Sequence, residues 1–467
     1  MKQADLKGKR VTVFGLGLNE GGVGTVEFLE RAGVREIIVT DVKKRDDLLP
    51  SLKKLERYKN ITYILGQHRP EDFTHTDLVV KNPAIPWTNE YVRLAESKGI
   101  PVEMDSSLFF ASCRNKIYGV TGTKGKTTVA SMLAHILESA GRPVARVGIS
   151  QTPVLGMLEK VKPGDTVVFE LSSWRLSALG RAKRSPELAV FTNLYPDHLN
   201  YYRTMAGYRK DKKYIYQFQK KTGILVANDS LDFIREEPPA GTTLYFSESG
   251  TVSGNGGFFR DDEAIVVRDG VESVLFRKSE LLIPGVHNQG NMLAAALAAF
   301  AAGVEPAKIA ASARTFKGVP HRLEFVLEKK GVSFYNDTAA TIPEAVISAL
   351  RSFDRSVILI AGGADKNLSF GDFAEEILAR TKGAVFFSGN ATEGLLREIR
   401  NRLPADDARR QFEVAPSMEK AVELAYRAAE PGDIVLLSPG AASFGMFTNE
   451  FDRGERFRTA VAALPGA

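Results

Sequence analysis

Short apolar runs alternate with stretches of helical spacing along most of the 467-residue chain. The run KRVTVFG at 9–15 predicts a strand, GLGLNEGGVG at 15–24 a glycine-rich turn, and VEFLERAG at 26–33 a helix. A second apolar run, EIIVTD, ends at Asp41, and a further one, DLVVKNP, covers 77–83. Strands that alternate with helices favour mostly parallel sheets that helices cover on both faces.

The pattern falls into three blocks. The first ends near residue 113 and is similar to the opening of a Rossmann-like nucleotide unit, in which an acidic residue follows the second strand. Its glycine turn departs from the G-x-G-x-x-G spacing and is a weak indicator by itself. The second block contains the strands TVVFELSS, LAVFTN and GILVAND, and the third alternates VSFYND, VILIAGG, AVFFSG, FEVAP and IVLLSPG with helical stretches. Short strands with turn signals at 243–283 predict a small β insertion in the second block.

We therefore predict an α/β protein of three domains. A Rossmann-like domain would cover 1–113, a central domain 114–318, and a second Rossmann-like domain 319–467. The central domain would hold a P-loop-type, mostly parallel sheet and a small β lobe. A chain of this length suits about two to four domains.

Composition narrows the class of protein. The single cysteine, Cys113, excludes an internal disulfide and suits a reducing compartment. It has no histidine near it in sequence, so we assign it no catalytic role. Apolar runs such as 293–303 are far shorter than the roughly 18 residues that a membrane span needs. The N-terminal MKQADLKGKR has no apolar signal region. We expect a cytoplasmic protein without membrane insertion.

The net charge of +6 is modest for this length. A basic excess accompanies nucleic-acid binding, but the sequence shows no aromatic-interleaved basic stripe and no nucleic-acid motif. A cleft for several phosphates also collects Lys and Arg, and a solvated basic surface is the commonest origin of so small an excess. We expect no nucleic-acid partner.

The segment GVTGTKGKTT at 119–128 predicts a phosphate-binding loop between a strand and a helix. Gly122 and Gly125 allow backbone N–H groups to turn toward an anion, Lys126 can reach the outer phosphates, and the Thr127 hydroxyl can bind Mg²⁺. The loop departs from G-x-x-x-x-G-K-[ST], because the first glycine would fall at Val120. An ordinary strand-to-helix turn is the alternative.

Polar clusters follow further predicted strands, at the edge where open α/β sheets carry their sites. Glu170 ends one strand and precedes Ser172 and Ser173, while Asp197 and His198 follow another with Asn193. A carboxylate and an imidazole near a phosphate loop suit Mg²⁺ that bridges to ATP. Taken singly, such residues are more often helix caps.

Three more clusters have ordinary alternatives. Lys212 lies four residues after Tyr208, so both would share one helical face, although the pattern by itself predicts a basic exposed helix. The segment PGVHNQGN, with His287, Asn288 and Asn291, opens a predicted helix, where capping is the common role. The pair His321–Arg322 lies at the boundary of the second and third blocks, where residues can grip a nucleotide when domains close.

Eight motifs occur in the order seen in the Mur ligases: TGTKGKTT, ELSSW, TNLYPDHL, the lysine of YRKDKKYI, PGVHNQGN, GVPHRLE, YNDTAAT and SPGAASFGMF…FDRG. The chain resembles this family over all three blocks, and most closely the member that adds D-glutamate to UDP-N-acetylmuramoyl-L-alanine. The resemblance implies that ATP phosphorylates the terminal carboxylate and that the glutamate amine then displaces phosphate.

The resemblance also implies the residues of the central site. Lys126, Glu170, His198 and Lys212 would be catalytic. Lys126 and Thr127 would hold the ATP phosphates and a first Mg²⁺. Glu170 and His198 would hold a second Mg²⁺ with the help of a carbamate on Lys212. Lys210 and Lys213 are alternatives to Lys212 if the register differs. The implied ATP-binding residues are Gly122, Thr123, Lys124, Gly125, Lys126, Thr127, Thr128, Asn288, His321, Arg322 and Asp337.

In the outer domains the resemblance implies two further sites. The UDP-substrate-binding residues would be Leu18, Asn19, Asp41 and Asn82, and the amino-acid-binding residues Thr341, Lys366 and Ser443. The chain departs from the family pattern at Lys124, where Asn is usual, at Ala339, where Lys is usual, and at Glu450, where an aromatic residue is common. RVGISQTPVL also lacks the usual G-N-I-G.

Several alternatives remain open at this point. A related ligase would add L-glutamate or another amino acid, but the D-N-P-R motif of the diaminopimelate-adding member does not occur, and folylpolyglutamate synthase lacks the first block. An NAD(P)-dependent oxidoreductase would fit two Rossmann-like blocks but not the phosphate loop. A non-catalytic nucleotide-binding module is the third possibility. We expect a monomer that uses small-molecule substrates.

Overall fold

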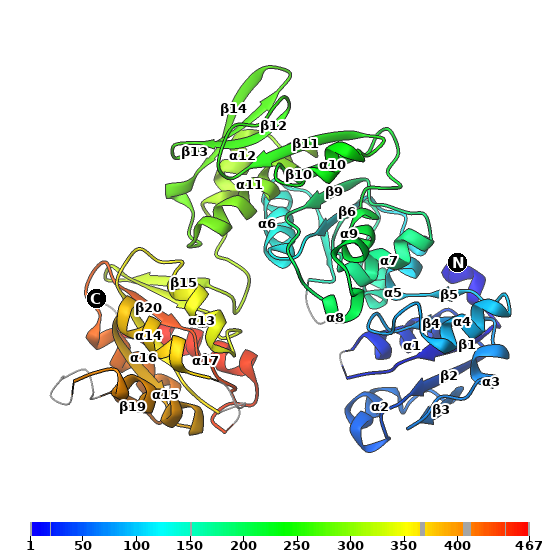
Figure 1. Ribbon diagram of the computed structural model, residues 1–467, viewed down its shortest axis with the longest axis horizontal. Coiled ribbons are helices and arrows are strands. Elements are labelled where there is room, and N and C mark those ends of the chain that lie inside the picture. Colours follow the sequence, from blue (N-terminus) through cyan, green and yellow to red (C-terminus); the bar gives the residue numbers. More distant parts are fainter. Residues whose placement is uncertain are drawn as a thin grey trace. The chain divides into compact units, whose positions relative to one another are not determined.

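The computed structural model of the chain (Figure 1) describes all residues except Met1, Asn19, 150–151, 365–368, 405–411, Phe444 and 466–467. The chain forms two compact units. The first contains residues 1–278 and 290–313, and the second contains 279–289 and 314–467. Three sheets organise the described residues, two in the first unit and one in the second.

The N-terminal sheet has five parallel strands in the order β3-β2-β1-β4-β5. Its strands are β1 (Arg10–Phe14), β2 (Glu36–Asp41), β3 (Ile61–Leu65), β4 (Leu78–Lys81) and β5 (Val102–Glu103). Its α-helices are α1 (Gly21–Arg31), α2 (Leu49–Leu55), α3 (Glu71–Thr74), α4 (Glu90–Ser97) and α5 (Asp105–Ser112), with short 3₁₀ helices at Gln3–Leu6 and Asp46–Leu48. The strand order reverses between β1 and β4, which is where such sheets bind ligands.

The central sheet has nine strands in the order β14-β13-β12-β11-β10-β9-β6-β8-β7. The strands are β6 (Ile117–Thr121), β7 (Val144–Val147), β8 (Thr166–Glu170), β9 (Leu188–Phe191), β10 (Ile224–Asn228), β11 (Thr242–Ser247), β12 (Gly256–Arg260), β13 (Glu263–Arg268) and β14 (Val271–Arg277). Strands β6–β12 pair in parallel, and β12–β14 are antiparallel. The β insertion that the sequence predicts therefore continues the central sheet.

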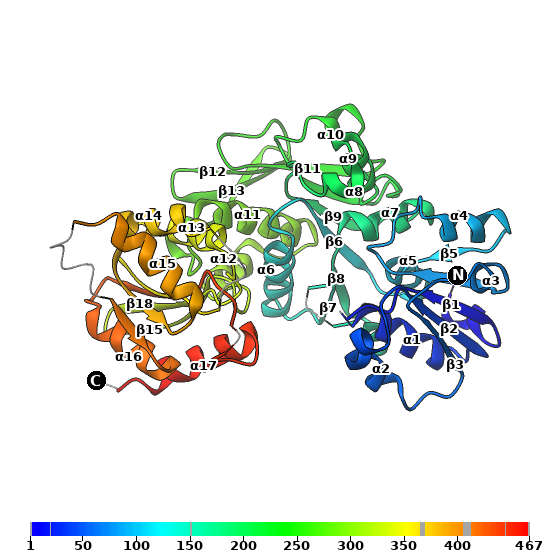
Figure 2. The ribbon, with the colours of Figure 1, turned by 60° about the horizontal axis from the view of Figure 1, so that its bottom comes forward.

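The helices of the central part lie on both faces of that sheet. They are α6 (Lys126–Ser139), α7 (Ser173–Arg181), α8 (Leu199–Tyr202), α9 (Met205–Lys213), α10 (Phe233–Glu236), α11 (Val286–Ala301) and α12 (Pro306–Ala313), with 3₁₀ helices η3 (Leu155–Glu159) and η4 (Lys278–Glu280). Figures 1 and 2 show α6 on one side of the sheet and α7 and α9 on the other. The phosphate loop follows β6, and the segment that leads into α7 follows β8. These two strands are neighbours in the sheet.

The sheet of the second unit has the order β15-β16-β20-β17-β18-β19, with β15 antiparallel and the others parallel. The strands are β15 (Glu324–Lys329), β16 (Val332–Asn336), β17 (Val357–Ala361), β18 (Thr381–Phe387), β19 (Glu413–Ala415) and β20 (Ile434–Leu437). Helices α13 (Pro343–Leu350), α14 (Gly371–Arg380) and α15 (Asn390–Asn401) pack on one face, and α16 (Met418–Ala428) and α17 (Glu450–Ala463) on the other.

These sheets confirm the predicted α/β fold class. The boundaries at 113 and 318 remain predictions, and the segment 279–289 belongs to the second compact unit. Over the part of the chain that the structure describes, every helix is too short or too polar to cross a membrane.

The two sheets of the first unit share one apolar core. This core joins α1, α2 and α5 to β8 and α7 through residues such as Val26, Phe109, Phe169 and Leu176, all at most 1% exposed. Gly24 allows α1 to approach the segment before η3, because a Cβ at this position would lie 2.1 Å from the Cβ of Pro153.

Gly24→Ala should therefore destabilise the first unit. The added methyl group must displace Pro153, and overpacking of this kind costs roughly 1–3 kcal/mol. Gly21→Ala, in the same helix, is the matched control, because no atom lies within 4 Å of its added Cβ. The thermal unfolding midpoint should fall for Gly24→Ala and stay near wild type for Gly21→Ala. Equal midpoints for the two variants would contradict the tight approach.

Candidate functional site

The phosphate loop between β6 and α6 needs glycine at two positions. Gly122 and Gly125 have φ angles of +156° and +80°. A Cβ on Gly122 would lie 1.9 Å from Thr192 Oγ1, and one on Gly125 would lie 2.4 Å from Asn291 Oδ1. Both the backbone conformation and the packing exclude larger residues here.

A second loop, after β9, holds the phosphate loop in place. Thr192 Oγ1 donates to Lys124 O (2.7 Å), and Lys124 N donates to Asn193 Oδ1 (2.8 Å). Tyr195 N donates to Thr123 Oγ1 (2.9 Å). The loop is thus shaped by the protein itself, and α6 begins directly after it, so the positive end of the helix dipole lies at the loop, an arrangement that attracts anions.

The side chains of the predicted phosphate loop lie at the start of α6. Lys126 is the first residue of that helix, and its Nζ donates to Thr123 O (2.9 Å). Thr127 and Thr128 are half-buried in the first turn, and Lys124 is exposed. These placements are those expected for a loop that cradles phosphate.

Lys212 lies behind the loop, with only 1% of its surface exposed. Its Nζ donates to Gly122 O (2.7 Å) and lies 4.8 Å from the ring centroid of Tyr208. The prediction that Tyr208 and Lys212 share one face of a helix is confirmed, and the alternative of an exposed basic helix is wrong. Burial lowers the pKa of Lys212 well below its ordinary value, and Lys126 lowers this pKa further.

The charges of two carboxylates act on the Lys212 amine. Glu170 ends β8 and Asp197 follows β9, and the charges of both act on the pKa of Lys212 in the direction that raises it. Asp197 Oδ2 also lies 3.9 Å from Lys124 Nζ. The structure therefore gathers cations of the phosphate loop, two carboxylates and a desolvated amine in one place.

His198 reaches this place through a strained backbone conformation. Its φ angle is +53°, and its side chain is 42% exposed. Its ring centroid lies 5.1 Å from that of Trp174 and 6.0 Å from that of Tyr208, the residue against which Lys212 packs. Non-glycine residues in this region cluster at functional sites.

Oxygen donors near the loop fit a magnesium ion that also binds a nucleotide. Among the residues whose positions the structure describes, no three His, Cys, Asp or Glu side chains gather as a metal site. Mg²⁺ commonly takes one or two carboxylates and completes its coordination with water and substrate phosphates. Glu170, Thr127 and His198 could supply such a partial set.

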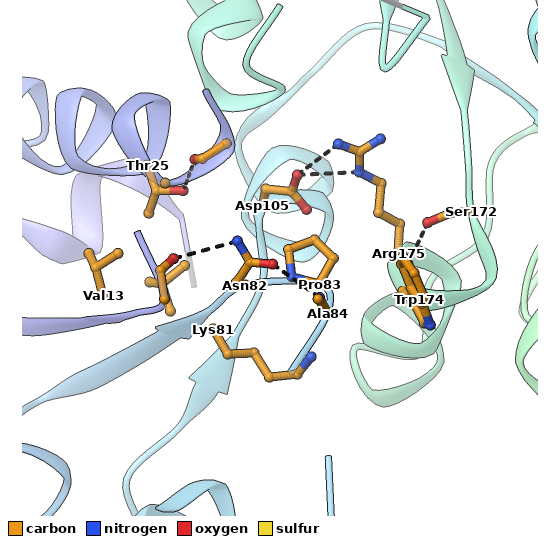
Figure 3. Close-up of a pocket in the computed structure, with 14 residues that line it drawn as sticks. Val13, Thr25, Lys81, Asn82, Pro83, Ala84, Asp105, Ser172, Trp174 and Arg175 are labelled. Atoms are coloured by element: carbon orange, nitrogen blue, oxygen red, sulfur yellow. Dashed lines mark hydrogen bonds and ion pairs between the residues drawn. The ribbon is translucent and has the colours of Figure 1, made fainter. Parts of the chain in front are cut away.

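A cavity of about 330 Å³ lies at the switch point of the N-terminal sheet (Figure 3). Its lining residues are Val13, Gly15, Gly21, Gly22, Thr25, Val80, Lys81, Asn82, Pro83, Ala84, Asp105, Ser172, Trp174 and Arg175. Of the predicted UDP-substrate residues, Asn82 lines it, and its Oδ1 accepts from Ala84 N (3.1 Å). The cavity is bounded by the N-terminal sheet and by the segment of the central part that leads into α7.

The other predicted UDP-substrate residues lie around the glycine turn. Asp41 is 6% exposed, and its Oδ2 accepts from Gly17 N (3.0 Å), so it holds the turn that follows β1. Leu18 is 45% exposed next to it. Asn19 lies outside the described residues. The structure thus places Asp41 and Asn82 on either side of the β1 turn.

Sequence reasoning missed three charged residues of this cavity, Lys81, Asp105 and Arg175. Arg175 donates to Asp105 Oδ2 from both Nε (3.3 Å) and Nη2 (3.1 Å), as Figure 3 shows. The partners are 70 positions apart in sequence. Arg175 directly follows the quoted motif ELSSW, which is the signal that could have identified it.

Polar residues of the second unit gather where β16 and β20 end. Asp337 Oδ2 accepts from Ser438 Oγ (2.7 Å), and Asp337 Oδ1 accepts from Leu323 N (3.1 Å). Burial raises the pKa of Asp337 to about 7, although both hydrogen bonds oppose this shift. Asp337 is thus a carboxyl group that the folded protein keeps partly protonated near neutral pH.

His321 lies beside this carboxyl in the same unit. It is 9% exposed, its φ angle is +67°, and its Nε2 lies 3.2 Å from Arg458 Nη2. Burial and then Arg458 lower the pKa of His321. Arg322 is exposed, and Asn288 is 7% exposed with its Nδ2 donating to Pro284 O (2.8 Å).

Two of the three predicted amino-acid-binding residues can be placed. Ser443 is 4% exposed, and Thr341 is half-buried. Lys366 lies outside the described residues. Its neighbour Ala364 pairs through backbone hydrogen bonds with Ala442, so the segment before Lys366 runs beside the one that carries Ser443.

The two departures in this region also come close to each other. Ala339 N donates to His321 O (3.0 Å), and the neighbouring Thr338 donates from Oγ1 to Glu450 O (2.9 Å). The fully buried Arg453 binds both Thr338 Oγ1 and Thr338 O (3.0 Å each). The Ala339 and Glu450 segments are therefore packed together.

Comparison with known proteins gives matches along the chain. Residues 9–103 match the Mur ligase MurD-like N-terminal domain, 120–299 the Mur ligase middle domain, and 321–440 the Mur ligase glutamate ligase domain. The chain is 42% identical to the UDP-N-acetylmuramoylalanine--D-glutamate ligase of Roseiflexus sp. (strain RS-1), over 98% of this chain and 99% of that protein. It is 35% identical to the ligase of the same name from Acetivibrio thermocellus, over 98% and 97%.

Solved structures show the same fold at lower identity. The UDP-N-acetylmuramate-alanine ligase of Thermotoga maritima matches with a TM-score of 0.54 and 18% identity, over 98% of this chain and all of that one. The MurF ligase of Thermotoga maritima, solved in complex with ADP, matches with a TM-score of 0.53 and 19% identity, over 98% and 96%.

The raised pKa of Asp337 predicts a pH-dependent stability. The pKa of Asp337 is about 7 in the folded state, against an ordinary value of 3.8 in the unfolded chain. Protonation of Asp337 therefore contributes fully to the free energy of unfolding below about pH 4, and this contribution is lost as the pH rises to about 7. Asp337→Asn should remove this loss. The unfolding midpoint of Asp337→Asn should therefore rise relative to that of wild type as the pH increases from about 5 to about 8. Asp354→Asn, at an exposed carboxyl, should show no such relative rise. A constant difference across this range would contradict the burial argument.

Proposed function

The chain belongs to the Mur ligase family, and on that premise we propose that it joins D-glutamate to UDP-N-acetylmuramoyl-L-alanine in an ATP-dependent reaction. The observation that carries the proposal is the preformed phosphate loop with the buried amine of Lys212 behind it. The identity to ligases of this name extends over nearly the whole chain and includes all three family domains.

The chemistry explains why a phosphate site is needed. A carboxylate is a poor electrophile, so an amine does not attack it directly. Transfer of the ATP γ-phosphoryl group to a carboxylate oxygen gives an acyl phosphate and ADP. The glutamate nitrogen then bonds to the acyl carbon, the carbon–oxygen bond to phosphate breaks, and the ammonium protons pass to solvent or to a base. The protein supplies positioning and charge stabilisation for both steps.

The phosphate loop would bind the ATP phosphates through its backbone N–H groups. Lys126 lies at the start of α6, and its Nζ would exchange Thr123 O for a phosphate oxygen, because a charge-assisted bond to phosphate is stronger than one to a carbonyl. Thr123, Lys124, Thr127 and Thr128 complete this loop. Asn288, His321, Arg322 and Asp337 remain proposed nucleotide contacts of the second unit.

Lys212 would act as a carbamate. A buried amine with a lowered pKa is neutral for much of the time, so its lone pair can attack CO₂; loss of one proton then leaves an anionic carbamate. Thr127 would hold a first Mg²⁺ beside the ATP phosphates, and Glu170, His198 and this carbamate would hold a second. When bound, Mg²⁺ would supply positive charge that neutralises the transferring phosphoryl group. Lys126 supplies the neighbouring positive charge that stabilises an anion at Lys212.

The outer sites are proposed from the resemblance, and for Asn82 and Asp41 also from their position beside the β1 turn. Asn82, Asp41, Leu18 and Asn19 would hold the UDP part of the substrate near the cavity at the β1–β4 switch point. Thr341, Lys366 and Ser443 would bind the glutamate carboxylates. A monomeric state and a cytoplasmic location remain predictions.

The proposed function is tested by phosphate release. Purified enzyme should release phosphate from ATP only when UDP-N-acetylmuramoyl-L-alanine and D-glutamate are both present. Turnover with L-glutamate and none with D-glutamate would show that the enzyme uses the L-isomer. No turnover with either isomer would contradict the proposal. A thermal shift with NADH and none with ATP would favour an oxidoreductase instead.

Lys126→Ala should abolish turnover without unfolding the protein. Loss of a cation that stabilises a transferring phosphoryl group costs a few kcal/mol, on the order of 100-fold or more in rate. Lys160→Ala, at an exposed lysine away from the loop, is the control and should behave as wild type. More than half of wild-type activity in Lys126→Ala, with an unchanged unfolding midpoint, would remove this loop from the ATP site.

Lys212→Ala should be nearly inactive but partly rescued by short carboxylic acids. Such acids can place anionic oxygens where the carbamate is missing. Lys213→Ala is the matched control, because Lys213 lies next in the helix and pairs with Glu237 instead. Rescue of the Lys213 or Lys210 variant, or full activity of Lys212→Ala without any acid, would contradict the assignment.

A further inference from the structure

The indole ring of Trp87 joins the two sheets of the first unit. It lies between two cations, with Lys81 Nζ 4.2 Å and Arg181 Cζ 4.3 Å from ring centroids of the indole. Its Nε1 donates to Ser177 Oγ (2.7 Å). Lys81 and Trp87 belong to β4 and the loop after it, whereas Ser177 and Arg181 belong to α7. We call these four residues the Trp87 latch.

Lys81 supports the ring from within the N-terminal sheet. Only 2% of its surface is exposed, and its Nζ donates to Ile85 O (2.8 Å), which closes the turn that carries Asn82, Pro83 and Ala84. Burial lowers the pKa of Lys81 to about 7, because removal of the charged amine from water is unfavourable. A lysine in this position shapes the loop rather than meeting solvent.

Ser177 carries the contact on to the other wall of the cavity. Its Oγ accepts from Trp87 and donates to Trp174 O (2.6 Å), one turn earlier in α7. A second bond from the N-terminal part, from Ser106 Oγ to Arg175 O (3.0 Å), holds the same turn. The N-terminal part of α7 is therefore held by two residues outside the central part, Trp87 in the loop after β4 and Ser106 in α5.

The latch connects opposite walls of the cavity, and of its four residues only Lys81 lines it. Residues 81–84 form part of one wall, and Ser172, Trp174 and Arg175 form part of the other. Trp87 itself is not among the lining residues. The corner that leads into α7 begins at Glu170, the last residue of β8. The latch thus holds the loop at 82–84 against α7, the helix that follows the segment with Glu170.

We propose that Trp87 is a positioning residue for the UDP-linked substrate. It holds the loop at 82–84 at a fixed distance from Trp174 and Arg175, so that a substrate bound in the cavity is aligned toward Glu170. This inference rests on the proposed function. The phosphate loop is held by other contacts, those of Thr192, Asn193 and Tyr195, so binding of ATP does not depend on the latch.

Two variants remove the hydrogen bond of the latch from either side. Trp87→Phe keeps an aromatic ring between the cations but loses the N–H donor, and Ser177→Ala loses the acceptor. Each should raise the Kd for UDP-N-acetylmuramoyl-L-alanine, measured by calorimetry without ATP, roughly 3- to 10-fold. The double variant should bind no more weakly than the single ones, because both remove the same bond. Trp87→Leu, which also loses both ring–cation contacts, should bind more weakly still.

The Kd for a non-hydrolysable ATP analogue should stay unchanged in all these variants. Tyr58→Leu is the control, since it removes a ring–cation contact with Arg57 in the loop between α2 and β3, outside the cavity. Unchanged substrate Kd with only a lowered unfolding midpoint would overturn the proposal, as would equal losses for substrate and ATP analogue. If wild type itself failed to bind the UDP-linked substrate, the proposed function would fail first.

Discussion

Burial of the Lys212 amine behind the phosphate loop is the constraint on which the central site depends. The amine is bonded to Gly122 O, so the loop must bring that carbonyl inward, and Gly122 reaches this conformation only because it has no Cβ. Thr192 fills the space that a Cβ would occupy and donates to the loop itself. The loop, the β9 corner and α9 therefore fix one another's positions.

This burial has a chemical consequence. Transfer of a charged amine from water into a protein interior is unfavourable, so the folded state favours the neutral amine at Lys212. Glu170 and Asp197 oppose this effect but do not cancel it, and Lys126 adds to it. An amine that forms an ion pair with carboxylates is protonated. A neutral amine near carboxylates and a phosphate loop instead suits a group that becomes an anionic ligand after reaction with CO₂.

Much of this arrangement follows from sequence patterns. The strands near 9–15, 188–193 and 332–337 are visible as apolar runs, and Asp41, Glu170 and Asp337 lie at or after strand ends because polar residues there meet at one edge of a parallel sheet. The phosphate loop is visible from its glycines. The spacing of Tyr208 and Lys212 places both on one helical face.

Other features depend on contacts between distant segments. The run RKDKK predicts an exposed basic helix, and only the packing of α9 against the sheet buries Lys212. The segment 243–283 shows short strands, but the pairing of β11 with β10, which makes them part of the central sheet, is not visible in the local pattern. The bonds from Arg175 to Asp105 and from Trp87 to Ser177 join positions 70 and 90 apart, so no local pattern indicates them.

The central claim is that Lys212 carries a carbamate in the working enzyme, and ¹³C NMR tests it directly. Enzyme equilibrated with ¹³C-labelled bicarbonate should show a carbamate resonance that is present in wild type and in Lys213→Met and absent in Lys212→Met. The resonance should weaken as the pH falls, because protonation removes the lone pair that binds CO₂. Active wild-type enzyme without this resonance, or its persistence in Lys212→Met, would contradict the account.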